Sequence, residues 1–276
     1  MTVTRFAPSP NGSLHLGHAW SAIVAHDLAM ARGGRFLLRI EDIDGVRSLA
    51  DKPDEFREDL AWLGLTWEDV PKQSTRLAAY ADAVQSLTRQ GLLYPCTCTR
   101  KDISAMATRE GPEGLIYSGT CKDRTVDTDK PHSLRLDTKK LAHLIGETFW
   151  QDELQGRQFT DPQLLGDVVI VRKDAPFSYH LAATLDDAAD GVTLVTRGQD
   201  LFAMTHIHRA LQEVLSLPVP TWHHHGLLVD ESGAKLAKRR GSPSLADGRA
   251  AGEDGRALAA RLRAHDFPTG ISLASA

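Results

Sequence analysis

Two histidines, His15 and His18, lie at the start of a predicted helix, directly after a short apolar strand and a proline-containing loop. Residues three apart share one face of a helix, so both rings can reach the same ligand. The start of a helix also directs free N–H groups and a positive dipole outward, which suits a phosphate or carboxylate. Gly17 leaves the backbone open to a flat ligand. The turn therefore predicts an anion site, although such a pair is equally typical of an ordinary surface.

Charged residues follow two other predicted strands, at residues 35–40, which end in the acidic run at residues 41–44, and at residues 192–196. Ligands of open α/β sheets collect at the carboxyl ends of the strands. Glu41, after the first of these strands, is a candidate partner for a ligand amine, and Arg197, after the second, can clamp a carboxylate. Each residue considered alone is more typical of a surface turn.

A basic loop with Lys235, Lys238 and Arg239 follows a predicted hairpin whose strand begins at residue 222 and continues to residue 229. Such a loop can reach over a polyphosphate. The preceding run of three histidines, at residues 223–225, does not predict a metal site, because consecutive residues of a strand point to opposite faces.

The three cysteines of the chain, Cys96, Cys98 and Cys121, lie in one short window. In a chain without a secretion signal this grouping favours metal binding over disulfides. A closed tetrahedral zinc site needs a fourth ligand, for which Tyr117 and His132 are candidates, with Asp123 a weaker one. The alternative is three unconnected thiols.

The elements that must position these residues alternate in the manner of an α/β protein. Pro8, Pro10 and Gly12 end the first strand, Ser13 can cap the next helix, and that helix extends to Gly33. Further helices are predicted at residues 53–63, 77–92, 202–215 and 253–263, and further strands near residues 133–136, 148–151 and 166–171.

The composition indicates the broad class of protein. The 276 residues are 42% hydrophobic and 25% charged, with a net charge of −4, as in an ordinary soluble globular protein. No apolar run approaches the length of a membrane span, and no signal peptide is recognisable. We therefore expect a cytoplasmic protein that does not bind nucleic acid indiscriminately.

The combination of motifs resembles the class I aminoacyl-tRNA synthetases. Their HIGH motif is similar to residues 15–18 and their KMSKS motif to residues 235–239. Residues 5–10, 38–44 and 197–201 are similar to the glutamyl branch of that class. The resemblance covers residues 3–240 and implies a Rossmann-type catalytic domain.

A glutamyl-tRNA synthetase continues past this basic loop into a long anticodon-binding region, for which the sequence leaves no room. With residues 94–98 and 117–121, the chain resembles the glutamyl-Q tRNA(Asp) synthetase family. The resemblance implies ATP, L-glutamate and queuosine-bearing tRNA(Asp) as substrates, Mg²⁺ with ATP, and a structural zinc ion at Cys96, Cys98, Tyr117 and Cys121. A compact glutamyl-tRNA synthetase acting on a tRNA 3′ end, and a non-catalytic RNA-binding relative, are the alternatives. We expect a monomer.

The resemblance also assigns roles residue by residue. It implies that glutamate is bound by Arg5, Phe6, Ala7, Pro8, Ser9, Glu41, Tyr179 and Arg197. It implies that ATP is bound by His15, Gly17, His18, Lys235 and Lys238, of which His15, His18 and Lys238 are catalytic. One departure is Ala237, which stands where the family motif has a small hydroxyl residue; we expect a modest loss of about 1 kcal/mol in phosphate binding.

The expected organisation is a catalytic domain with an insertion. Residues 1–93 and 166–240 form its two halves, residues 94–165 the zinc-binding insertion, and residues 241–276 a short C-terminal helical segment.

Overall fold

The computed structural model describes residues 1–236 and 243–274. Its centre is a parallel sheet in which β1 (Val3–Phe6), β2 (Arg35–Leu38) and β3 (Glu68–Asp69) pair in the order β1-β2-β3. All of β1, and all of β2 except Arg35, is buried. Buried strands of this kind belong to a sheet that is covered on both faces.

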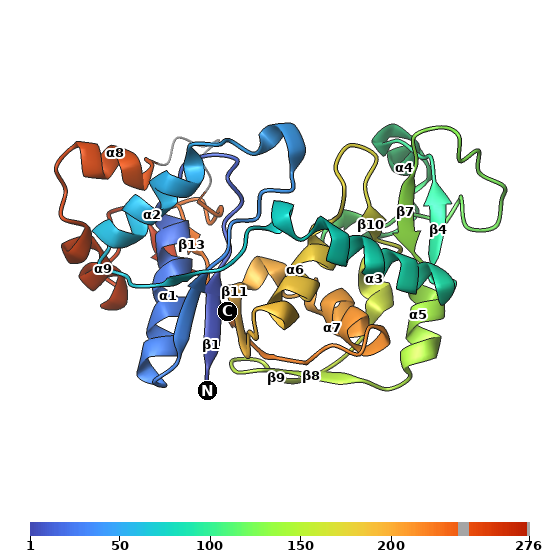
Figure 1. Cartoon of the computed structure of the whole chain (residues 1–276). Helices are drawn as coiled ribbons and strands as arrows, with labels where there is room; N and C mark the ends of the chain where they lie inside the picture. Colours follow the sequence, from blue (N-terminus) through green and yellow to red (C-terminus); the bar gives the residue numbers. More distant parts are fainter. Residues whose placement is uncertain (237–242, 275–276) are drawn as a thin grey trace.

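A second group of strands continues on the other side of β1 (Figure 1). It comprises β11 (Leu194–Gly198), β12 (Thr221–His225), β8 (Phe149–Asp152) and β9 (Gly156–Phe159), in that order. β11, β12 and β8 are mutually parallel, and β9 returns antiparallel to β8. The groups meet where the Thr193 N–H donates to the Val3 carbonyl at 3.0 Å. The carboxyl ends of β1 and β11 therefore lie side by side.

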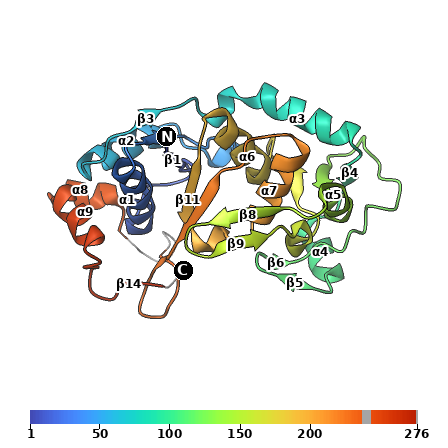
Figure 2. The ribbon, with the colours of Figure 1, turned by 90° about the horizontal axis from the view of Figure 1, so that it is seen from below.

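One face of the β1-β2 region is covered by helices from both ends of the chain. α1 (Leu16–Ala31) and α2 (Lys52–Trp62) pack there with α8 (Leu245–Ala250) and α9 (Gly255–Arg263) around one apolar core. Figures 1 and 2 both show α8 and α9 beside α1 and α2. A short pairing of β13 (Leu228–Val229) with β14 (Ser272–Leu273) completes this side.

The other half of the molecule has its own core. It is formed by α3 (Leu77–Arg89), α5 (Thr138–Ile145), α6 (Tyr179–Ala189) and α7 (Thr205–Val214), with the antiparallel sheet β10 (Val169–Val171), β7 (Ser133–Leu136) and β4 (Leu93–Cys96). The remaining elements are α4 (Arg100–Met106), β5 (Glu110–Gly111), β6 (Gly114–Leu115) and 3-10 turns at Gly45–Arg47, Gln73–Thr75, Pro162–Leu165 and Gln199–Leu201. Among the described residues, every helix is too short or too polar to cross a membrane.

Two local predictions were wrong, and one helix was missed. The cap of α1 is His15 and not Ser13, whose hydroxyl instead accepts a hydrogen bond from Lys52 at 3.2 Å. The strand ending at His225 does not continue to residue 229, because Leu228–Val229 pairs separately with β14. The short helix α8 was not predicted; Ser244 and Asp247 cap it.

Candidate active site

A pocket of about 1390 Å³ opens at the carboxyl ends of β1 and β11, against the start of α1. It contains every described residue of the predicted site: Arg5, Phe6, Ala7, Pro8, Ser9, His15, Gly17, His18, Glu41, Tyr179, Arg197 and Lys235. Lys238 and Ala237 lie outside the described residues. Segments from six parts of the chain thus converge on one cavity.

The two histidines form a reciprocal cap at the start of α1. His15 Nδ1 accepts a hydrogen bond from the Gly17 N–H, and His18 Nδ1 accepts one from the His15 N–H, each at 3.1 Å. The ring centroids are 3.9 Å apart. A Cβ added to Gly17 would lie 3.0 Å from Cε1 of His15, so only glycine leaves this ring undisturbed.

This geometry fixes the protonation of both rings. Because a backbone N–H can only donate, each Nδ1 is an acceptor and each neutral ring carries its proton on Nε2. Burial, and to a smaller extent His15 and Lys235, lowers the pKa of His18 to about 3. Burial also lowers the pKa of His15. Both rings are therefore neutral at pH 7, with Nε2–H groups available as donors.

A buried charge network lies beside the histidines. Arg5 binds Asp187 through Nε at 2.8 Å and Nη2 at 3.2 Å, and its Nη1 donates to the Thr196 carbonyl at 2.8 Å. The fully buried Arg39 contacts Asp187 at 2.8 Å and Glu41 at 3.2 Å. Although burial raises it, the two guanidinium groups hold the pKa of Asp187 below its ordinary value.

Glu41 differs from Asp187 in its balance of charge. Burial raises the pKa of its carboxyl to about 7, and Arg39 and Arg5 offset this only in part. An ammonium group entering the pocket would favour the ionised form of Glu41. Glu41 is thus a buried carboxylate that still lacks a full counter-charge.

Arg197 is held in a different manner, by uncharged acceptors. Its Nε donates to His224 Nε2 at 3.0 Å, and its Nη1 lies 3.1 Å from His208 Nδ1 and 3.3 Å from the Tyr179 hydroxyl. Its Nη2 donates to the Thr205 hydroxyl at 2.5 Å. The side chain is buried, and Arg197 is one of the residues that line the pocket.

Sequence reasoning missed the residues that form the networks around these arginines: Arg39, Asp152, Asp187, Thr205, His208 and His224. Two signals were available. Acidic residues in the otherwise apolar α6 indicate buried partners for cations. The histidine run on β12 indicates alternating roles, and indeed His224 contacts Arg197 while His223 pairs with Glu153 at 3.1 Å.

The basic loop begins at the pocket. Lys235 forms an ion pair with Asp200, and its backbone pairs with Val229 in the predicted hairpin. On the far side of residues 237–242, Ser244 pairs with His15, and the Leu245 N–H donates to the Leu14 carbonyl at 2.8 Å. The described residues on both sides of the loop therefore adjoin the pocket.

The three cysteines form a separate cluster in the other half of the molecule. Their sulfur atoms lie within 4.8 Å of one another, and the Sγ atoms of Cys98 and Cys121 are 3.5 Å apart. A tetrahedral zinc ion with Zn–S bonds of about 2.3 Å requires S···S separations of about 3.8 Å. The spacing therefore fits a zinc site, and neither His132 nor Asp123 belongs to the group.

The tyrosine oxygen lies among these sulfur atoms. The Tyr117 hydroxyl is 3.5 Å from Cys96 Sγ and 3.6 Å from Cys98 Sγ, and it accepts the Cys121 N–H at 2.8 Å. Although burial raises it, the hydrogen bond with Tyr117 and neighbouring donors lowers the pKa of Cys121 to about 6. A thiol with a lowered pKa is more readily ionised, and the resulting thiolate favours the binding of a metal cation.

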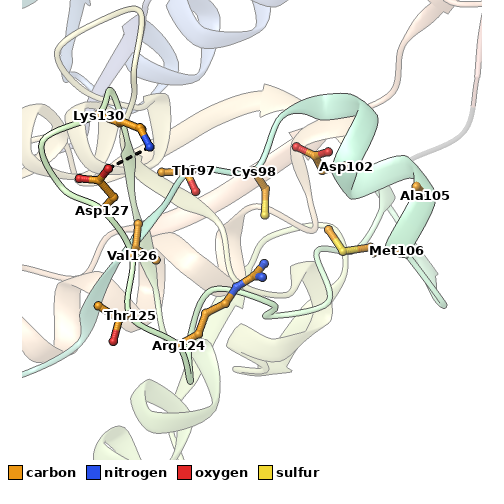
Figure 3. Close-up of a pocket in the computed structure, with 10 residues that line it drawn as sticks. All are labelled: Thr97, Cys98, Asp102, Ala105, Met106, Arg124, Thr125, Val126, Asp127 and Lys130. Atoms are coloured by element: carbon orange, nitrogen blue, oxygen red, sulfur yellow. Dashed lines mark ion pairs between the residues drawn. The ribbon is translucent and has the colours of Figure 1, made fainter.

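A smaller pocket of about 440 Å³ adjoins the cluster (Figure 3). The side chain of Arg124 points between Cys98 and Met106, and its Nη2 lies 4.0 Å from Cys121 Sγ. At the opposite wall, Lys130 pairs with Asp127 at 3.0 Å. The cysteine cluster is therefore close to a solvent-accessible, charged hollow.

Solved structures with the same fold belong to tRNA synthetases. A glutamate-tRNA synthetase from Elizabethkingia anophelis superposes with a TM-score of 0.71 and 25% identity, covering 90% of this chain and 53% of that one. This chain thus spans about half of that enzyme. Methionyl-tRNA synthetase from Mycobacterium tuberculosis, with a TM-score of 0.62 and 15% identity over 98% of this chain and 65% of that one, shares the fold alone.

Sequence comparisons are more specific. The model of the class I tRNA synthetases (E and Q), catalytic domain, matches residues 1–262. The glutamyl-Q tRNA(Asp) synthetase of Rhodobacter capsulatus is 47% identical over 268 residues, covering 91% of this chain and 95% of that protein. The protein of that name in Deinococcus radiodurans is 42% identical over 265 residues, covering 94% and 88%. The chain therefore belongs to the class I tRNA synthetases of the E and Q type and, within them, to the glutamyl-Q tRNA(Asp) synthetases.

Proposed function

We propose that this chain activates L-glutamate with ATP and transfers it to the queuosine base in the anticodon of tRNA(Asp). The observation that carries the proposal is that one pocket contains both a buried carboxylate and a buried guanidinium. Neither of these two groups has a full counter-charge from the described residues of the protein. Glu41 suits the substrate ammonium, and Arg197 suits a substrate carboxylate. An amino acid with an acidic side chain supplies both groups.

The first step is attack of the substrate α-carboxylate on the α-phosphorus of ATP, with pyrophosphate leaving. Negative charge on the phosphates increases in this step, so positioning and electrostatic stabilisation supply most of the catalysis. The Nε2–H groups of His15 and His18 and the start of α1 would donate to these oxygens. In the second step a hydroxyl of the modified base attacks the adenylate carbonyl and AMP leaves.

The basic loop would complete the phosphate site. We propose that Lys235 and Lys238 bind the departing pyrophosphate. Lys235 lines the pocket, and the described residues flanking the loop adjoin it. Mg²⁺, when bound with ATP, supplies charge neutralisation of the phosphates. Replacing Lys238 with Ala should reduce glutamate-dependent ATP–pyrophosphate exchange by at least about 100-fold. A near-normal exchange rate in that variant would exclude the role.

Tyr117 is the fourth zinc ligand in this proposal, because its hydroxyl is within 3.6 Å of two of the sulfur atoms. The ion would stabilise residues 94–165 as an insertion between the catalytic halves, residues 1–93 and 166–240, with residues 241–276 as a C-terminal segment. It would take no part in the chemistry. We further propose that the enzyme acts as a monomer.

The test of the function is incubation with labelled glutamate, ATP and tRNA(Asp), with or without queuosine, followed by mapping of the label. We expect the label in the anticodon nucleotide and only with queuosine present. Label at the 3′ end would instead identify a compact glutamyl-tRNA synthetase. No label and no glutamate-dependent pyrophosphate exchange would identify a non-catalytic RNA-binding relative.

A further inference from the structure

The pocket contains two buried arginines in opposite electrostatic situations. Arg5 forms an ion pair with Asp187 through two hydrogen bonds, from Nε and from Nη2. Arg197 is as deeply buried, yet within residues 1–236 and 243–274 it forms no ion pair of 4.0 Å or less. A buried cation without a counter-ion is costly unless its hydrogen bonds are satisfied and an anion arrives. The two arginines therefore have different tasks.

Uncharged groups satisfy most of the Arg197 donors. A guanidinium carries five N–H groups, and the acceptors of Arg197 are His224 Nε2, the Tyr179 hydroxyl, His208 Nδ1 and the Thr205 hydroxyl. Each acceptor fixes the direction of the guanidinium plane without neutralising it. The full positive charge is thus kept for a ligand.

Each histidine acceptor is oriented by a partner on its other nitrogen. His224 Nδ1 lies 2.7 Å from Asp152 Oδ2, so the proton is on Nδ1 and Nε2 is free to accept from Arg197. His208 accepts through Nδ1, and its Nε2 lies 3.4 Å from His180 Nδ1. Burial lowers the pKa of His224 to about 4 and that of His208 well below its usual value. Both rings are neutral acceptors at pH 7.

We propose that His208 and His224 are positioning residues that hold Arg197 without neutralising it, and that this uncharged cradle makes the pocket select a substrate carboxylate over the corresponding amide. The inference rests on the proposed function, since it concerns glutamate in the same pocket. It predicts that the charge of the cradle, and not only its shape, determines affinity for glutamate.

A matched pair of variants separates charge from shape. His208→Asn and His208→Asp have the same size, and each offers an oxygen close to the position of Nδ1, but only Asp would neutralise Arg197. We expect L-glutamate to bind His208→Asn within about threefold of wild type and His208→Asp about 10- to 100-fold more weakly, the difference between a charge-assisted and a neutral hydrogen bond. Preference for glutamate over glutamine should fall by the same factor.

The readout is the dissociation constant of L-glutamate, and of L-glutamine for comparison, by titration calorimetry with the full chain and without turnover. The dissociation constant of ATP should be unchanged in both variants, which a general structural defect would not allow. Equal glutamate affinity in the two variants would overturn the proposal, whether that affinity is close to the wild-type value or equally reduced in both.

If His208→Asp does not fold, a second pair of variants, at His224, tests the same proposal. His224→Gln keeps an uncharged acceptor for Arg197 and a donor for Asp152, whereas His224→Met removes both. Weaker glutamate binding to the Met variant by about tenfold relative to Gln supports the cradle, and equal binding overturns it. A wild type that binds glutamate but transfers none to tRNA would contradict the proposed function and leave this inference intact; a wild type that binds no glutamate contradicts both.

Discussion

The pocket and the cysteine cluster are built in different ways. The pocket takes its side chains from segments far apart in the sequence, and most are bound to protein partners: Arg5 and Asp187 are separated by 182 positions and Arg197 and His224 by 27. The cluster uses residues 96–121 and packs in a small core of its own. Its three sulfur atoms lie within 4.8 Å of one another, and Arg124 approaches Cys121 Sγ to 4.0 Å.

The difference shows which interactions hold each site together. The pocket depends on ion pairs and hydrogen bonds between the two halves of the molecule, so the same contacts stabilise the fold and shape the site. The cluster would take its order from the proposed zinc ion, because three bound thiolates are held together by the charge of the metal. Damage to the pocket network should therefore affect the whole protein, and damage to the cluster should remain local.

The largest effect is expected from Arg39→Met. Arg39 is fully buried and contacts Glu41, Asp187 and Asp190, so its removal leaves buried carboxylates without their cation. The free energy of unfolding should fall by about 3–5 kcal/mol, as measured by denaturant titration.

A matched control is available on the same strand. Arg35→Met breaks the exposed pair of Arg35 with Glu68 and should lower the free energy of unfolding far less than Arg39→Met does, because water screens the exposed charges. Equal losses of stability in the Arg39 and Arg35 variants would show that the buried network does not hold the two halves together.

An intermediate effect is expected from pH. The ionised form of Glu41 is the one that binds an ammonium, and in the empty pocket its pKa is raised to about 7, first by burial. Below pH 7 the ionised fraction falls about tenfold per unit, so the dissociation constant of glutamate should rise by up to about tenfold per unit between pH 7 and 5. His18 does not titrate in this window, since its pKa is about 3.

Calorimetry across this pH range measures the effect. Glu41→Gln should bind glutamate weakly at every pH and show a flat profile. A wild-type profile as flat as that of the variant would mean that Glu41 does not contact the substrate ammonium.

The smallest effect on glutamate activation is expected from Cys96→Ser. Loss of one thiolate should reduce bound zinc from about one ion per chain to nearly none and loosen residues 94–126, while pyrophosphate exchange changes little. Metal analysis and amide hydrogen exchange measure the first two results. A metal-free wild type that is fully folded and active would refute the zinc site, and loss of exchange in the variant would refute the independence of the two regions.

Local spacing made part of this arrangement predictable. The turn with His15 and His18 and the group of three cysteines involve residues close in sequence, and both predicted sets come together in the structure. Glu41 and Arg197 were predictable because ligands of open α/β sheets bind at the carboxyl ends of the strands. Both residues follow a predicted strand, and both line the pocket.

Long-range partners were not predictable. Nothing near Arg197 in the sequence indicates that His208 on α7 and His224 on β12 contact it, or that Asp152 on β8 orients His224. These contacts depend on how the elements pack. The helix α8 was missed because it has only 6 residues and includes Gly248, a poor helix former. The proposal of Tyr117 as the fourth zinc ligand follows from no common spacing rule, and here the family resemblance supplied it.

The most direct test of the site is a crystal structure with the sulfamoyl analogue of glutamyl-adenylate, which does not transfer its amino acid. The proposal predicts the side-chain carboxylate on Arg197, the ammonium on Glu41 and the sulfamoyl oxygens near His15 and His18, each within about 3.2 Å. An analogue bound with its ammonium away from Glu41, or with its side-chain carboxylate away from Arg197, would contradict the account.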